Sequence, residues 1–391
     1  MPYELVPRSA HSKDALQKMD LTAIVPRLPP VVDGVGDYAL CLARLLRDNV
    51  GITTRFIVTD PAWIGPDKVD GFEVRHMSSH STDELLNLLA HYSKTGDSSA
   101  GEQVLLHYEG YGYATRGCPF WLVEALERWR HASDKRVLVT MFHELYAKGP
   151  PWTSSFWLSR VQKNLTVRLA RLSDRWLTSL ERYARVVQKM SGKELSEPHH
   201  LAVFSSIGEP QSAAPLNERR RRLVVFGTRG RRIEVYKKSA ADLNRICGAL
   251  RIEEIVDIGR VVDFDIARVL DVPVVTCGEL PGSEVSDVLL DSVAGVIDYP
   301  ASMLGKSTIF AAYCSHRMIP IVANYGDGRP ADGLEAGTHY WLSGVARERV
   351  SMASGQLMAD RAFEWYQAHS LSAHARRLAS CLTPGSLAAN L

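Results

Sequence analysis

Short apolar runs recur along the chain, and most of them lead through a polar loop into a segment that is apolar on one side only. An all-apolar run is typical of a buried strand in a parallel sheet, whereas one-sided segments are typical of amphipathic helices. This pattern predicts strands at 21–25, 53–58, 103–107, 136–141, 175–178, 201–204, 223–226, 254–258, 272–277, 294–297 and 319–323, with 340–342 as a further short candidate.

Helical patterns alternate with these strands. They cover 84–92, 120–130, a long segment ending near 170, 237–250, 283–290 and 356–382. A strand–helix alternation predicts a parallel sheet with helices on both faces. The polar segment 208–222 contains prolines and charges and separates two such series, so we predict two doubly wound α/β domains joined by a linker. The basic run 219–222 is expected to be a solvated part of that linker.

Composition narrows the class of protein. The chain has 391 residues, 46% apolar content, 23% charged residues and a net charge of +2, which are typical of a globular protein with domains of about 100–200 residues. No basic stripe is interleaved with aromatic residues, so no nucleic-acid partner is expected. No apolar run reaches the roughly 18 residues of a membrane span, and the polar N-terminus does not resemble a signal peptide. The six cysteines are scattered, and a reducing cytoplasm is expected.

One loop has the chemistry of an anion site. The predicted strand 294–297 leads into a small-residue loop, and Gly305, Lys306, Ser307 and Thr308 stand where the next helix should begin. The first N–H groups of a helix lack partners and attract negative charge. A P-loop is excluded by spacing, because Pro300 stands where that motif needs a glycine. The alternative is an ordinary strand-to-helix connection.

A second loop, after the first strand, matches a dinucleotide fingerprint. Gly34, Gly36 and Ala39 fit G-x-G-x-x-A, and Asp60 follows the next strand. The fingerprint needs a tight turn directly after the strand, but residues 26–33 intervene and include three prolines. An NAD(P)-dependent enzyme therefore remains only an alternative.

Further segments stand in a definite order: 33–38 with an apolar-faced helix behind it, Phe142-His143-Glu144 at a strand end, Phe226-Gly227-Thr228-Arg229, Cys277-Gly278-Glu279-Leu280-Pro281, and Glu364-Trp365-Tyr366. In this order they resemble the GT-B nucleotide-sugar glycosyltransferases, and more closely the large, mostly retaining family of bacterial sugar transferases. The resemblance covers about residues 21–382. It implies two Rossmann-like domains, an acceptor-side domain at 1–210 and a donor domain at 211–370, with a tail helix, 371–391, that packs on the N-terminal domain.

The resemblance also implies transfer of a sugar from a nucleoside-diphosphate sugar to a glycan, glycolipid or small-molecule acceptor. The residues expected to bind the donor are Gly227, Arg229, Lys238, Gly278, Leu280, Gly305, Lys306, Ser307 and Thr308. The facing N-terminal loops contribute Gly34, Gly36, Asp37, Glu109 and Tyr111, and the catalytic candidates are His143 and Glu144. For His143 the alternative is a buried, structurally satisfied histidine, and for Glu109 and Glu144 it is an ordinary polar loop residue.

One departure limits the resemblance. The family usually carries two glutamates, eight positions apart, which contact the donor sugar and the ribose. Ser302 and Phe310 stand at those positions. A GT-B-fold protein that binds nucleotide sugars or a partner without catalysis is therefore a second hypothesis. No metal or cofactor is expected, because no Asp-x-Asp loop or histidine ligand spacing is present. Peripheral contact with the inner membrane face is left open.

Overall fold

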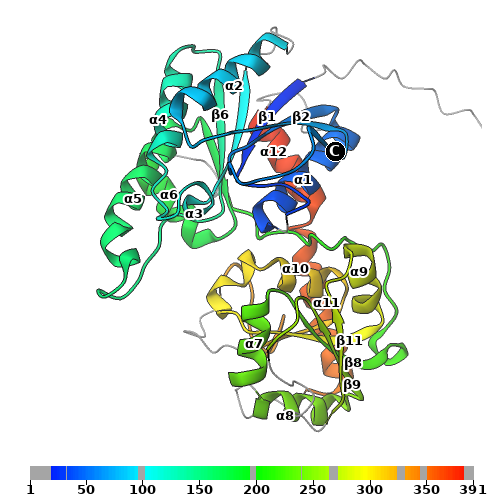
Figure 1. Ribbon diagram of the computed structural model, residues 1–391. Helices are drawn as coiled ribbons and strands as arrows, with labels where there is room; N and C mark the ends of the chain where they lie inside the picture. The colour runs from blue at the N-terminus through cyan, green and yellow to red at the C-terminus, as the bar shows by residue number, and fades with distance from the viewer. Residues whose placement is uncertain are drawn as a thin grey trace, which may run out of the picture.

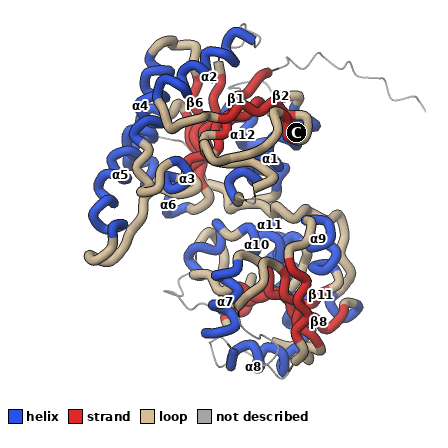
Figure 2. The backbone as a smooth tube through the Cα atoms, viewed as in Figure 1, coloured by secondary structure: helices blue, strands red, loops and turns tan. Residues whose placement is uncertain are grey.

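The computed structural model describes residues 19–31, 33–95, 102–193, 200–238, 240–263, 272–323, 331–343 and 350–382. It is an α/β protein with two separate sheets, each covered by helices on both faces (Figures 1 and 2). The predicted fold class of two Rossmann-like, doubly wound domains is confirmed.

The N-terminal sheet has the order β3-β4-β2-β1-β5-β6-β7. All its pairings are parallel except that of β3 with β4, which form an antiparallel hairpin at one edge. The strands are β1 Met19–Val25, β2 Ile52–Val58, β3 Lys68–Val69, β4 Phe72–His76, β5 Gln103–Tyr108, β6 Val137–Phe142 and β7 Arg175–Thr178.

Helices cover both faces of this sheet, and the apolar sides of these helices fill two buried clusters against it. They are α1 Gly34–Leu45, continued by the π-helical turn Leu46–Val50, then α2 Thr82–Thr95, α3 Gly110–Tyr113, α4 Phe120–His131, α5 Ser154–Leu172 and α6 Glu181–Ser191. Because every strand of a parallel sheet runs the same way, the loops that follow β1, β5, β6 and β7 all lie at one edge.

The C-terminal sheet is wholly parallel, with the order β10-β9-β8-β11-β12-β13. Its strands are β8 Arg220–Phe226, β9 Glu254–Ile258, β10 Val274–Gly278, β11 Ser292–Ile297, β12 Ile319–Val322 and β13 Trp341–Leu342. Its helices are α7 Arg229–Lys238, α8 Ala240–Leu250, α9 Gly282–Leu290, α10 Thr308–Ser315 and α11 Met352–Gln367, with short 3-10 turns at Leu216–Glu218 and Ala301–Lys306.

The last helix, α12 Leu371–Leu382, returns to the N-terminal domain and lies beside α1 (Figure 1). Tyr38 Oη on α1 and His374 Nδ1 on α12 form a buried hydrogen bond of 2.7 Å. The carbonyl oxygen of Leu382 accepts a hydrogen bond of 3.3 Å from Gln103 Nε2 on β5. The expected tail helix thus packs as the resemblance implied up to residue 382, and the rest of the tail lies outside the described residues.

Three local expectations differ from the structure. Residues 201–204 form no strand; only His200 makes a bridge, to Thr178. The single helix predicted at 237–250 is instead two helices, α7 Arg229–Lys238 and α8 Ala240–Leu250. The basic run 219–222 is not solvated linker: β8 begins at Arg220, and the buried Arg219 donates to the carbonyl oxygens of Ala214, Ser292 and His316. A count of local polarity does not reveal this burial, because two of the three acceptors, the Ser292 and His316 carbonyl oxygens, lie far away in the sequence.

Among the described residues, no helix is both long enough and apolar enough to cross a bilayer.

Candidate functional site

The strand order of each sheet reverses at one point. In the N-terminal sheet this point lies between β1 and β5, and in the C-terminal sheet between β8 and β11. In doubly wound sheets, ligands bind beyond the carboxyl ends of the strands at such a point, where the neighbouring loops diverge to opposite faces. The topology therefore predicts one binding region in each domain, before any side chain is considered.

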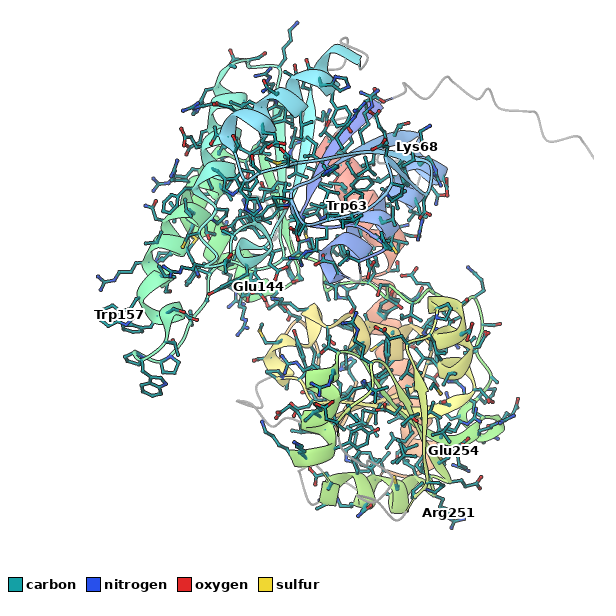
Figure 3. The ribbon with its side chains drawn as sticks, viewed as in Figure 1. Trp63, Lys68, Glu144, Trp157, Arg251 and Glu254 are labelled. Carbon is teal, nitrogen blue, oxygen red and sulfur yellow. The ribbon has the colours of Figure 1, made fainter. Side chains whose placement is uncertain are left out.

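The two edges meet across the domain boundary. Lys306, in the turn after β11, forms an ion pair with Glu144, which follows β6. Tyr183 Oη donates a hydrogen bond of 3.0 Å to the other Glu144 oxygen, and the Lys306 ammonium lies 5.2 Å from the centre of the Tyr183 ring. Figure 3 places Glu144 at the side of the N-terminal domain that faces the other domain. The predicted phosphate-binding lysine and a predicted catalytic carboxylate are thus brought together.

The backbone around Lys306 is also fixed between the domains. Val203 N–H donates to the Gly305 carbonyl oxygen at 2.8 Å, and Glu181 N–H donates to Asp332 Oδ1 at 2.7 Å. A Cβ on Gly305 would lie 3.1 Å from both Asp332 Oδ2 and Leu180 Cδ2. Gly305 is therefore needed for close packing of the turn against the N-terminal domain, and its own amide does not define a phosphate cradle.

The start of α10 has free hydrogen-bond donors. Ser307 is the N-cap, and its hydroxyl accepts from Phe310 N–H at 3.1 Å. Within the described part of the chain, no partner is recorded for the N–H groups of Thr308 and Ile309. A Cβ on Gly227, at the end of β8, would lie 2.3 Å from Ile309 Cδ1. The start of α10 and the loop after β8 thus lie against each other at the switch point.

The other expected donor residues have different environments. Arg229 pairs with Asp263, and its Nε donates to the Val261 carbonyl oxygen at 3.2 Å. Lys238 is exposed in the last turn of α7 and pairs with Glu234. Gly278 has a φ of +71° at the end of β10, and Leu280 packs against the core. Lys238 is one helix length, about 13 Å at 1.5 Å per residue, from the α7 start at the cleft, so it is separated from the other donor candidates.

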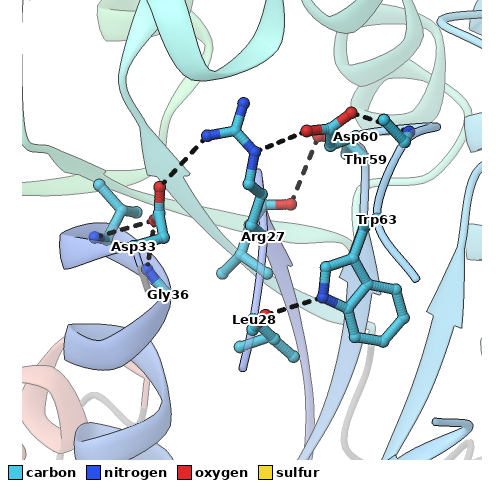
Figure 4. Close-up of polar contacts among 10 residues, drawn as sticks. Arg27, Leu28, Asp33, Gly36, Thr59, Asp60 and Trp63 are labelled. Carbon is cyan, nitrogen blue, oxygen red and sulfur yellow. Dashed lines mark hydrogen bonds and ion pairs between the residues drawn. The ribbon is translucent and has the colours of Figure 1, made fainter. Parts of the chain in front are cut away.

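The start of α1 is already occupied by protein groups (Figure 4). Asp33 Oδ1 accepts hydrogen bonds from Val35 N–H at 3.1 Å and Gly36 N–H at 2.8 Å. Arg27 lies between Asp33, at 3.6 Å, and Asp60, at 2.5 Å. A Cβ on Gly36 would lie only 2.2 Å from the Arg27 carbonyl oxygen. Gly36 therefore permits the helix to contact the proline-containing loop and does not admit a pyrophosphate, while Gly34 has open space beside it.

The proline-containing loop is tied to β2 as well (Figure 4). Trp63 Nε1 donates to the Leu28 carbonyl oxygen at 2.7 Å, and Thr59 N–H donates to that of Val25 at 3.0 Å. Asp60, the residue at the ribose position of the dinucleotide fingerprint, also accepts from Ala62 N–H at 2.9 Å. Its carboxylate thus serves to hold the loop. Arg27 was not among the predicted site residues, although its place after the first strand was a usable signal.

Two predicted carboxylates lie near this helix start. Burial, reinforced by the nearby Asp33 and Glu144 charges, raises the pKa of Glu109, and no partner is recorded for its carboxylate within the described chain. Burial, with the Asp33 charge adding to it, raises the pKa of Asp37 to about 6. Glu109 follows β5 at the switch point, and its raised pKa makes it a better proton acceptor than an ordinary carboxylate.

His143 lies in a buried group of aromatic and imidazole rings. Its Nε2 is 3.1 Å from His107 Nδ1, and its ring meets Tyr38 edge-on at 5.0 Å. Tyr38 in turn contacts His374 and stacks on Phe204 at 4.5 Å. Burial, with the neighbouring His107 and Lys306, holds the pKa of His143 well below its usual value. His143 is therefore neutral. No sequence pattern predicts this group, because its members come from β5, the residue after β6, α1, a loop and α12.

The aromatic side chains near the predicted site differ in how far they are buried. Tyr108 and Tyr113 are core residues, and Tyr113 Oη donates to the carbonyl oxygens of Ile24 and His107. Tyr111 is half exposed, and its hydroxyl accepts from Gln162 Nε2 at 3.2 Å. Phe310, at the position of the family's second glutamate, is fully buried against Tyr340 and Trp365. No carboxylate can contact a ribose from that position.

Two donor-side residues were missed by sequence reasoning. The Arg231 guanidinium stacks over the Tyr299 ring at 4.9 Å, and its NH1 donates to the Asp298 carbonyl oxygen at 3.4 Å. Both residues follow strands of the switch point, so their positions at the ends of β8 and β11 could have identified them. Among the described residues, no group of three or more His, Cys, Asp or Glu side chains is arranged to hold a metal ion.

Comparison with known proteins adds the name of the fold. No family model and no curated protein matches the sequence. A glycosyltransferase from Rickettsia africae superposes with a TM-score of 0.61 at 11% identity, over 94% of this chain and 98% of its own. A pneumococcal O-GlcNAc transferase in complex with UDP and GlcNAc gives 0.57 at 9%, over 94% and 99%. A putative UDP-N-acetylglucosamine 2-epimerase from Listeria monocytogenes gives 0.53 at 13%, over 95% and 98%. The chain has the GT-B fold, as the sequence resemblance predicted.

Proposed function

We propose that the protein is a glycosyltransferase that takes a sugar from a nucleoside-diphosphate sugar. The observation that carries this proposal is the start of α10, where two N–H groups that have no recorded partner among the described residues lie beside Lys306 at the switch point of the C-terminal sheet. A helix start binds phosphate oxygens through such N–H groups. Solved structures of similar fold hold UDP, UDP-glucose or UDP-2-fluoro glucose, which supports the same ligand class.

The chemistry requires stabilisation of a leaving diphosphate. As the bond between the sugar C1 and the diphosphate oxygen breaks, negative charge grows on the diphosphate, and fixed N–H groups and cations stabilise it. The Thr308 and Ile309 N–H groups, with Lys306 and Arg229, are the candidates. The acceptor hydroxyl attacks C1 and loses its proton. Glu109 and Glu144 are the carboxylates at the facing edge, and Glu109, whose pKa is raised by burial, is suited to take it.

We assign His143 a role in the complex with substrate, when the donor bound to the C-terminal domain meets the N-terminal domain. It is neutral and buried beside the Lys306–Glu144 pair, so it can hydrogen-bond to substrate without bringing a charge. His143→Ala is expected to bind a nucleoside diphosphate normally and to transfer sugar at least roughly tenfold more slowly, because losing an interaction made only in the transition state lowers kcat and kcat/KM alike, and a tenfold loss needs only about 1.4 kcal/mol. Unchanged turnover on an identified acceptor would assign His143 to packing alone.

A non-catalytic binding protein is the second candidate function. The Lys306–Glu144 ion pair and the buried Phe310 favour it, since both replace groups that would contact a donor. The acceptor class, a glycan, glycolipid or small molecule, and metal-independent transfer are part of our proposal. A nicotinamide cofactor fits poorly, because Asp33 already occupies the N–H groups at the start of α1.

The decisive experiment uses a proline at the first position of α10. Thr308→Pro removes one N–H and one hydroxyl, and proline is compatible with a first helical position. We expect it to weaken binding of UDP or another nucleoside diphosphate by at least about tenfold, because hydrogen bonds to charged groups contribute about 1.5–3 kcal/mol. Thr308→Ala, which keeps the N–H, is the matched control.

Binding is measured by calorimetry after a thermal-shift panel of nucleoside diphosphates and NAD(P). A ligand at 100 times its Kd stabilises by about 2.7 kcal/mol, which shifts the melting temperature clearly. No stabilisation by any nucleoside diphosphate would overturn the donor site. Donor binding without transfer or donor hydrolysis would favour the non-catalytic function.

A further inference from the structure

Three exposed aromatic residues of the described chain, among them its two strongly exposed tryptophans, lie within six residues of one another. Trp152 is 84% exposed, Trp157 71% and Phe156 43%. They lie in the loop before α5 and in its first turn, where the N-terminal domain protrudes (Figure 1). Figure 3 shows Trp157 at the outer end of this protrusion, pointing away from Glu144. Large exposed aromatic patches in a folded protein mark interaction sites.

The same segment is basic. Residues 145–172 contain five lysines and arginines and no aspartate or glutamate. Lys148, Arg160 and Lys163 are exposed, and no acidic partner is recorded for them within the described chain. Arg160 and Lys163 lie on the same exposed side of α5 as Phe156, four and seven residues further along the helix. We call Lys148, Trp152, Phe156, Trp157, Arg160 and Lys163 the aromatic tip.

We propose that the aromatic tip docks the protein on an anionic lipid bilayer. Tryptophan rings prefer the boundary between lipid headgroups and acyl chains, and unpaired lysines and arginines are attracted to anionic headgroups. The three cations lie within 16 residues of one another in the same segment as the exposed rings, so one bilayer surface supplies both the apolar and the anionic contact that this segment calls for. The carbohydrate acceptor of the proposed reaction is not an alternative occupant, because Trp157 points away from Glu144. The inference does not depend on the proposed transferase activity.

The test is sedimentation of the full chain with vesicles of phosphatidylcholine alone and with phosphatidylglycerol added. Wild type should bind the anionic vesicles, bind neutral ones weakly, and release as salt is raised. Replacing Lys148, Arg160 and Lys163 together by glutamine should weaken binding by about a hundredfold, at roughly fivefold per cation. The matched control replaces Lys68, Lys135 and Lys189, which are exposed elsewhere and have no recorded acidic partner; it should bind like wild type.

A second pair of variants tests the rings. Trp152→Ser combined with Trp157→Ser should weaken vesicle binding by about tenfold or more and abolish a blue shift of tryptophan fluorescence on binding. Ile64→Ser, at another strongly exposed apolar residue, is the control. All replaced side chains are exposed, and equal melting temperatures will show that the fold is kept.

The proposal is overturned if wild type does not bind anionic vesicles, if it binds neutral vesicles equally well, or if both tip variants bind like wild type. Binding of the tip to single-stranded DNA without vesicle binding would likewise overturn it, in favour of a nucleic-acid partner.

Discussion

The starts of α1 and α10 each lie at the switch point of their sheet. They differ in whether protein groups already accept hydrogen bonds from their first N–H groups. At the start of α1, the Asp33 carboxylate accepts hydrogen bonds from two N–H groups. Gly36 packs directly against the Arg27 carbonyl group. At the start of α10, the neutral Ser307 hydroxyl accepts one N–H, and two others have no recorded partner in the described chain. Both sequences contain the small residues of an anion site. Only the second keeps the donors that an anion needs, so glycine content alone does not distinguish a binding loop from a packing contact.

The largest expected effect concerns the buried histidines next to α1, His107 and His374. They should make the free energy of unfolding fall at acid pH. Burial lowers the pKa of His107 to about 3 and of His374 to about 4, below the unfolded value of about 6.5. Stability is therefore fully present above about pH 6.5 and is lost as pH falls toward the folded values. Each histidine should contribute a slope of about 1.4 kcal/mol per pH unit.

Urea unfolding at a series of pH values measures this slope. His374→Gln should reduce it by about one histidine's share of 1.4 kcal/mol per pH unit, despite its lower stability at neutral pH. The control is His91→Gln on α2, where the side chain is exposed, and it should leave the slope unchanged. An unchanged slope in His374→Gln would mean that His374 is not buried in its neutral form.

The two glycines of α1 should differ sharply. Gly36→Ala places a Cβ 2.2 Å from the Arg27 carbonyl oxygen, and we expect a loss of about 3 kcal/mol, at the upper end of overpacking effects. Gly34→Ala meets open space and should change stability by less than about 1 kcal/mol, because alanine is the better helix former. Denaturant titrations compare them. Equal losses would show that the loop before α1 yields easily.

The Lys306–Glu144 pair tests whether the start of α10 is open to a ligand. Lys306→Met should weaken nucleoside-diphosphate binding by about tenfold, as loss of a charged hydrogen bond predicts. Glu144→Gln should strengthen it, because the ammonium no longer pairs with a carboxylate. Calorimetry on both variants decides. If neither affinity changes, Lys306 only joins the domains.

Asp37 should produce the smallest effect. Its pKa is raised from 3.8 to about 6, so its contribution to stability is present below the unfolded value and is lost as pH rises through about 6. At neutral pH, Asp37→Asn should stabilise the protein by about 1 kcal/mol or less, after allowance for its partial exposure. The gain should disappear near pH 4 in the same unfolding assay. A gain that is independent of pH would point to a cause other than charge.

The sequence by itself determined the two α/β series, most strands to within a residue or two, and the loops from which the candidate site is built. It could do so because strand burial, helix amphipathicity and helix starts are local properties of the chain. It also excluded the P-loop, since Pro300 breaks that spacing.

Tertiary structure alone decided which of these groups meet. Lys306 and Glu144 are 162 residues apart, and the rings around Tyr38 come from four separate segments. Arg219 is buried with its guanidinium satisfied by the nearby Ala214 carbonyl oxygen and by those of Ser292 and His316 from distant segments. Nothing in the neighbouring sequence records such partners, because a hydrogen bond or ion pair depends on distances in space, and those are set only when the two domains and α12 pack together.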